Sequence, residues 1–163
     1  MTNHITSSQP ALAADDPRAV FTTAARIART VIDGVRPDQM TLPTVCPEHD
    51  VRSMLGHMLT VFRRITALGN GDDPMAMPDA VTGIADEAWS ATFADAAHRV
   101  QAAWSDSAKL QQMMTLPWAT APGAGMLASY TSELTVHTWD LARATGQAVE
   151  WDEPTVQVAL ATA

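Results

Sequence analysis

Three side chains that suit metal coordination stand in two segments of the sequence. Glu133 and His137 lie four residues apart in SELTVHTWDLA, and His57 lies in MLGHML. Residues four apart on a helix leave the same face, with their Cβ atoms about 5–6 Å apart. A carboxylate and two imidazoles from two packed helices form a set that suits a divalent metal ion with open coordination positions. We therefore expect His57, Glu133 and His137 to be metal ligands.

Each of these residues also has a role that requires no metal. A single histidine on an apolar helix face is more commonly a hydrogen-bonded core residue, and a Glu-x3-His spacing alone is common. Glu133 can face solvent and pair with Arg143, although a carboxylate among apolar side chains is costly to bury unless it is paired or metal-bound. Two other interpretations therefore stay open. One is a metal- or ligand-binding module of a stress response, without turnover. The other is a structural bundle in which His57 and Glu133 share a buried hydrogen bond.

Two further residues on the segment of Glu133 are candidates for catalysis. Tyr130 lies three residues before Glu133, and Asp140 lies three residues after His137. The Asp140 carboxylate can hold the free imidazole N–H of His137, or it can face solvent. We expect Tyr130 and Asp140 to orient a substrate or to shuttle a proton.

The remaining thiol and imidazoles are expected to lie outside this site. Cys46 precedes His57 by eleven positions, which corresponds to roughly 16 Å along a helix at 1.5 Å per residue. We expect a buried loop thiol there rather than a fourth ligand. His49, at a helix start, and His98, on the polar side of a helix, are expected to be surface residues.

The elements that position these residues follow from apolar spacing and from capping signals. Carboxylates begin the expected helices and glycines end several of them. A short extended piece is expected over Met113–Leu116. The expected helices run from Asp15 or Asp16 to Gly34, from Pro47 to Gly69–Gly71, from about Asp86 through Trp104, from about Gly125 to Thr145, and from Glu153 to the end of the sequence.

Four long helices and a partial fifth predict an all-α fold, an antiparallel four-helix bundle. Residues 1–14 are small and polar, so we expect a disordered lead-in followed by one helical domain over residues 15–163. Hydrophobic residues make up 47% of the 163-residue chain and charged residues 17%, which is ordinary for a globular protein.

Composition also narrows the class of function. The net charge is −8 with ten Lys plus Arg, and no basic cluster occurs, so nucleic-acid binding is not expected. No apolar run is long enough to span a bilayer, and no basic amphipathic helix suggests attachment to a membrane surface. The N-terminal segment lacks the pattern of a secretory signal, and a single cysteine agrees with a reducing compartment. We therefore expect a cytoplasmic protein.

Together the two segments resemble a known family. PTVCPEHDVRSMLGHML followed by SELTVHTWDLARATGQ is similar to the actinobacterial branch of the DinB-like superfamily, typified by mycothiol-dependent maleylpyruvate isomerase. The resemblance covers nearly the whole chain and implies a DinB-like four-helix bundle. The metal ligands of the family fall on His57, Glu133 and His137. One departure is His49, where the family usually has tryptophan.

The resemblance also implies a chemistry. The expected ion is Zn²⁺, with Ni²⁺ or another divalent ion as the alternative, and its open position would hold a water. Mycothiol or a similar small thiol would replace that water and be deprotonated by the metal. The implied activity is thiol transfer to a small electrophile, or its thiol-assisted isomerisation. The isomerase carries an additional C-terminal domain not included here, so its own activity is not carried over. Whether the chain forms a homodimer stays open.

Overall fold

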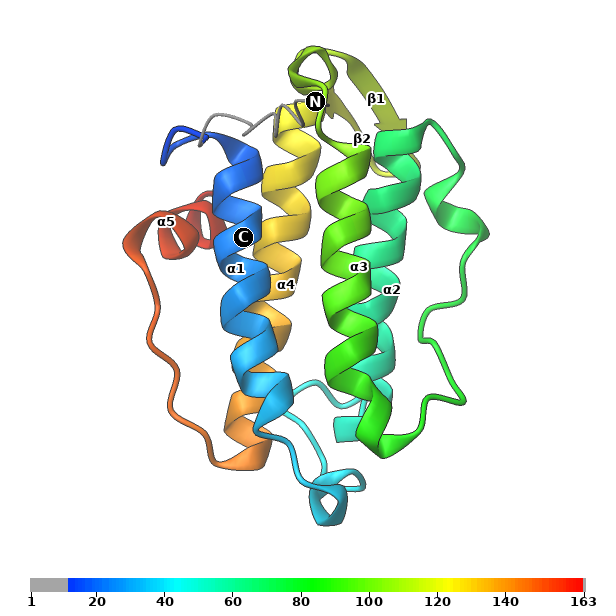
Figure 1. Cartoon of the computed structure of the whole chain (residues 1–163), viewed down its shortest axis with the longest axis vertical. Helices are drawn as coiled ribbons and strands as arrows, with labels where there is room; N and C mark the ends of the chain where they lie inside the picture. The colour runs from blue at the N-terminus through cyan, green and yellow to red at the C-terminus, as the bar shows by residue number, and fades with distance from the viewer. Residues whose placement is uncertain (1–11, 163) are drawn as a thin grey trace, which may run out of the picture.

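Four long helices stand side by side in the computed structural model, which describes residues 12–162 (Figure 1). They are α1 (Pro17–Asp33), α2 (Val51–Asn70), α3 (Trp89–Ala103) and α4 (Gly123–Thr145). A shorter helix, α5 (Glu153–Ala161), packs outside them against α4 and α1. The prediction of an all-α helical bundle is confirmed. Most of the expected lead-in, residues 1–11, lies outside the described residues.

Capping residues explain where the long helices begin and end. The Asp16 carboxylate accepts a hydrogen bond from the Arg18 backbone N–H at 2.9 Å, and Asp50 accepts one from Ser53 at 2.8 Å. At the C-terminal ends of α2 and α4, Gly71 and Gly146 adopt positive φ angles of 82° and 71°. Glycine takes this left-handed conformation without a Cβ clash.

One expected helix start and one expected helix cap were wrong. Helix α2 begins at Val51 rather than at Pro47, because the segment Cys46–His49 forms a separate turn closed by a backbone hydrogen bond. Asp86 does not cap α3, which has no side-chain cap and continues from a short 3-10 turn. The Asp86 carboxylate instead accepts a hydrogen bond from Arg52 at 2.6 Å.

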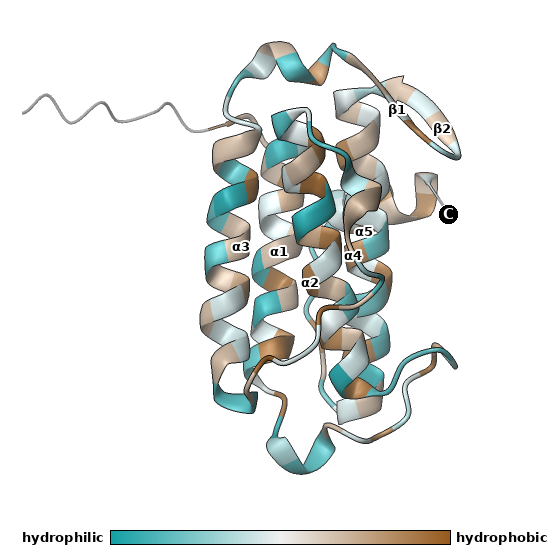
Figure 2. Cartoon of the chain, turned by 90° about the vertical axis from the view of Figure 1, so that its right-hand side faces the viewer, coloured by the Kyte–Doolittle hydropathy of each residue, from teal (hydrophilic) through white to brown (hydrophobic). Residues whose placement is uncertain are grey.

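The core lies between all four long helices. Helix α1 packs against α3 and α4, and α2 packs against the same two helices. Phe62 of α2 is at the centre, with its ring edge-on to Phe21 of α1 and Phe93 of α3 at 5.6 Å each. Hydrophilic and hydrophobic residues are interspersed along each helix, as expected for helices with one buried and one exposed face (Figure 2). Within residues 12–162, no helix has both the length and the apolar content needed to cross a membrane.

A long connection between α2 and α3 allows these two helices to run in the same direction, opposite to α1 and α4 (Figure 1). This connection lies against α2 at Gly56, whose carbonyl accepts a hydrogen bond from the Val81 N–H at 3.0 Å. A Cβ atom at Gly56 would collide with the Val81 carbonyl oxygen. The glycine before His57 therefore lets the connection approach α2 closely, and it brings Asp79 beside His57.

A small hairpin closes the end of the bundle between α3 and α4. The expected extended piece is confirmed as strand β1 (Met113–Leu116), which pairs antiparallel with β2 (Ala119–Pro122). Met114 and Leu116 point into the core, whereas Trp118 at the turn is exposed. The second strand was missed because Pro122 and Gly123 indicate a break rather than a strand.

Candidate metal centre

The structure brings His57, Glu133 and His137 together, because α2 packs against α4. The His57 Nε2 atom lies 3.4 Å from a carboxylate oxygen of Glu133, and the rings of His57 and His137 are perpendicular with centroids 4.9 Å apart. One donor atom from each residue lies within 4.8 Å of the other two. We call these three residues the central cluster. Two imidazoles and a carboxylate at these distances are compatible with one divalent ion.

A backbone carbonyl fixes the tautomer of His57. The Nδ1 atom of His57 lies 2.9 Å from the carbonyl oxygen of Asp79. A carbonyl oxygen only accepts hydrogen bonds, so Nδ1 carries the proton and donates it. The lone pair of the other nitrogen, Nε2, is left facing Glu133 in a neutral ring. This is the orientation in which a histidine binds a metal.

A carboxylate fixes the orientation of His137 in the same way. The Nδ1 atom of His137 lies 3.1 Å from a carboxylate oxygen of Asp140, three residues further along α4. Asp140 is 6% exposed. Of the two positions expected for Asp140, the structure therefore shows the buried one beside His137. The pair leaves Nε2 of His137 free on the side of the central cluster.

Glu133 also interacts with His57 when no ion is present. A hydrogen bond from His57 to the Glu133 carboxylate raises the pKa of His57 above its usual value, and burial of the ring opposes this shift. Glu133 is about one-third exposed. The central cluster is therefore accessible from solvent, and a proton on His57 occupies the place that a divalent ion would take.

Two buried polar atoms, the Tyr130 hydroxyl oxygen and the Arg64 Nε, have no hydrogen-bond partner in the described part of the chain. Tyr130 precedes Glu133 by about one turn of α4 and is 3% exposed, and its hydroxyl has no hydrogen-bond partner among the described residues. Burial and the nearby Glu133 carboxylate raise the pKa of Tyr130 to about 12, and the Arg64 guanidinium opposes this. The hydroxyl therefore stays protonated at neutral pH and can donate a hydrogen bond. The Nε of Arg64 also lacks a partner in the described part of the chain.

The expectation that His49 is a surface residue was wrong. Its side chain is only 9% exposed, and its ring stacks on that of His57 with centroids 4.9 Å apart. Burial, and then the neighbouring His57, lower the pKa of His49. Tight stacking follows from the turn that precedes α2, which folds the His49 ring back over the first turns of the helix. His98, in contrast, is exposed on α3 as expected.

Sequence reasoning also missed Asp79 and Arg64. Arg64 lies seven residues after His57, so the helical repeat places both on one face of α2, and this signal was present in the sequence. Asp79 acts through its backbone carbonyl. No side-chain pattern indicates such a contact.

Comparison with known proteins identifies the family of the chain. The family described as mycothiol maleylpyruvate isomerase N-terminal domain matches residues 20–142, a range that includes the central cluster. The chain belongs to this family. This family is the mycothiol-related branch that the two sequence motifs resemble. The clusters of His, Glu and Asp side chains in this chain are compatible with divalent-metal binding.

Two curated relatives come from Mycobacterium tuberculosis. "Uncharacterized protein MT0763" of strain CDC 1551 / Oshkosh is 27% identical over 138 residues, which cover 84% of this chain and 71% of the relative. "Uncharacterized protein Rv0738" of strain ATCC 25618 / H37Rv matches with the same identity and coverage. No solved structure matches the chain.

Proposed function

We propose that this protein binds a divalent metal ion through His57, Glu133 and His137, with Zn²⁺ as the expected ion. We further propose that it is a thiol-dependent transferase or isomerase acting on a small electrophile. One observation carries the proposal: both imidazoles are held at Nδ1 by oxygen acceptors, Asp79 and Asp140, so that Nε2 is the nitrogen that each ring offers to a metal ion. A purely structural bundle does not require both rings to be held in this orientation.

The donor set fits the ion. Two neutral imidazoles and one carboxylate are typical of catalytic zinc sites, which keep a position open for water or substrate. Ni²⁺ is the alternative, because imidazole ligands suit both ions. When bound, the metal and a mycothiol-type thiol would supply a thiolate nucleophile at neutral pH.

The residues around the central cluster support such a reaction by binding and orientation. The Tyr130 hydroxyl has no acceptor among residues 12–162 and can donate to an oxygen atom of the electrophile. Asp140 holds the His137 ring in position, and the positive charge of Arg64 lies near Tyr130 and favours an electrophile that gains negative charge during the reaction. Partial exposure of Glu133 gives small molecules a route from solvent.

The test combines metal content with thiol consumption. Zinc-loaded protein is mixed with mycothiol and monochlorobimane, an electrophile that becomes fluorescent when it is conjugated, and the spontaneous rate is subtracted. We expect a protein-dependent rate that His137→Ala abolishes together with zinc retention. The helical circular dichroism spectrum of His137→Ala should match that of the parent, because the apolar faces are unchanged. The control His98→Ala removes an exposed imidazole and should change neither quantity.

Two outcomes separate the alternatives. Full activity in metal-free His137→Ala protein contradicts the proposed mechanism. Zinc retention that depends on His137, with no conjugation of several electrophiles, favours a metal-binding module without turnover.

A further inference from the structure

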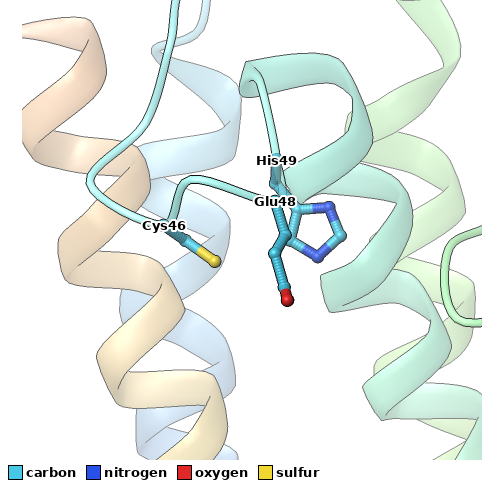
Figure 3. A group of neighbouring side chains, drawn as sticks. All are labelled: Cys46, Glu48 and His49. Atoms are coloured by element: carbon cyan, nitrogen blue, oxygen red, sulfur yellow. The ribbon is translucent and has the colours of Figure 1, made fainter.

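A second group of metal-ligating side chains lies in the turn before α2. The Cys46 thiol, the Glu48 carboxylate and a ring nitrogen of His49 lie within 4.8 Å of one another. Figure 3 shows the Cys46 thiol directed toward the side chains of Glu48 and His49. None of the three residues is a member of the central cluster. The thiol of this group gives it a different donor chemistry.

The backbone holds this turn in place without an ion. The His49 N–H donates to the Cys46 carbonyl at 3.1 Å. The Thr44 hydroxyl lies 2.9 Å from the Cys46 carbonyl oxygen and 2.7 Å from that of His49. Because the main chain is fixed, metal binding would order only side-chain torsions, and this reduces its entropic cost.

His49 presents a nitrogen that nothing else in the described structure uses. Its side chain is nine-tenths buried, and its Nδ1 atom is buried without a hydrogen-bond partner. Its Nε2 atom lies 3.8 Å from the Asp79 carboxylate, which is beyond hydrogen-bond distance. A buried imidazole with unused nitrogens is costly unless it gains a partner such as a metal ion.

His49 could also group with His57 and Asp79, whose donor atoms are equally close. This grouping fails because both nitrogens of His57 already have partners. Its Nδ1 donates to the Asp79 carbonyl, and its Nε2 faces Glu133. The free donors of His49 therefore combine with those of the turn.

We propose that Cys46, Glu48 and His49 form a second divalent-metal site, specific for ions of the Zn²⁺ and Co²⁺ class that accept thiolate, imidazole and carboxylate ligands. On binding, the thiol of Cys46 releases its proton to solvent and the S⁻ binds the ion. One thiolate and one carboxylate neutralise a 2+ ion. This neutrality limits repulsion from an ion in the central cluster.

The required movements are small. Donor atoms around a tetrahedral ion at 2.0–2.3 Å are roughly 3.5 Å apart. The three donor atoms already lie within 4.8 Å of one another, so rotations of the exposed Glu48 and the partly exposed Cys46 side chains can bring them to that spacing, and an ion can enter from solvent. A three-residue site leaves a fourth position for water or a small ligand. This second site shares no donor with the central cluster, so the two proposals stand or fall separately.

Cobalt reports on this second site selectively, because a Co²⁺–thiolate bond gives a charge-transfer absorption in the near ultraviolet and the central cluster has no thiol. The protein is reduced with a phosphine, freed of small thiols and titrated with Co²⁺. We expect about two equivalents per chain and the charge-transfer band. Cys46→Ser should lose the band and one equivalent. His137→Ala should keep the band and lose the other equivalent.

Glu48→Gln is the second variant, because Glu48 is exposed and its replacement leaves the fold intact. It should weaken the cobalt affinity measured from the band by at least about tenfold, as even outer partners of a metal do. The absence of the band in the parent protein overturns the second site. A band whose cobalt affinity is unchanged in Glu48→Gln also overturns it. A band that saturates at half an equivalent per chain overturns it too, because that stoichiometry indicates a thiolate site shared between two chains.

Discussion

Asp140→Asn should weaken zinc binding without unfolding the protein. The Asp140 carboxylate accepts from Nδ1 of His137 at 3.1 Å and is buried on α4. Asparagine has nearly the same size and keeps one carbonyl oxygen, so the His137 ring retains an acceptor. The variant loses only the negative charge behind the ring, and with it part of the basicity of Nε2.

The geometry gives the size of the effect. An ion bound at Nε2 of His137 would be roughly 7 Å from the Asp140 carboxylate, given the hydrogen bond, the ring and a metal–nitrogen bond of about 2.1 Å. Charges of 2+ and 1− at that distance attract by about 1.2 kcal/mol in water and by about 5 kcal/mol at an effective dielectric constant of 20. Because the central cluster is partly open to solvent, we expect a value toward the lower end. A loss of about 1.4–2.7 kcal/mol corresponds to a 10- to 100-fold lower affinity.

The assay is competition for Zn²⁺ with a chromophoric chelator, performed in a Cys46→Ser background that leaves only the central cluster. The matched control is Asp95→Asn, which removes the same charge from an exposed position on α3. It should change the affinity less than twofold. An unchanged zinc affinity in folded Asp140→Asn protein would refute the role of Asp140 in orienting a metal ligand.

Three further predictions follow from the same geometry. Gly56→Ala should destabilise the protein by about 1–3 kcal/mol in urea unfolding, because the new Cβ collides with the Val81 carbonyl. It should also lower the zinc affinity, because the collision displaces the connection that holds His57. Unchanged stability would contradict this prediction. In metal-free protein, the raised pKa of His57 should add to the free energy of unfolding. This contribution is complete below the pKa of His57 in the unfolded chain, about 6.5, and is lost as the pH rises through the pKa of His57 in the folded protein. Glu133→Gln should remove most of this pH dependence of unfolding. In the Cys46→Ser background, log zinc affinity against pH should approach a slope of about two at low pH, since both imidazoles must lose protons; a slope near one means that only one of them binds the ion.

The helices could be predicted because local chemistry determines them. Asp16 caps α1, and the glycines Gly71 and Gly146, which adopt positive φ angles, end α2 and α4 where the sequence predicts. The convergence of Glu133 with His57 also follows from helix periodicity and from the need to pack two apolar faces. Whether the three residues bind a metal stays a prediction.

The rest depends on contacts between segments that have no periodic signal. His49 lies over His57 because the Cys46–His49 turn reverses the chain before α2, and a single sequence does not show the direction of such a turn. Asp79 reaches His57 through a backbone carbonyl, which every residue has. Asp86 has the residue type of a helix cap, but its ion pair with Arg52, a tertiary contact, uses the carboxylate instead.

The location of zinc in a crystal of the zinc-loaded protein tests the central claim most directly. Anomalous scattering at the zinc edge should give a peak about 2.0–2.2 Å from Nε2 of His57, Nε2 of His137 and a carboxylate oxygen of Glu133. A Glu133→Gln crystal prepared in the same way should show this peak weakened or lost. If zinc-loaded crystals show no peak between these three residues, or if Glu133 points away from the ion toward solvent, the proposed metal centre is wrong.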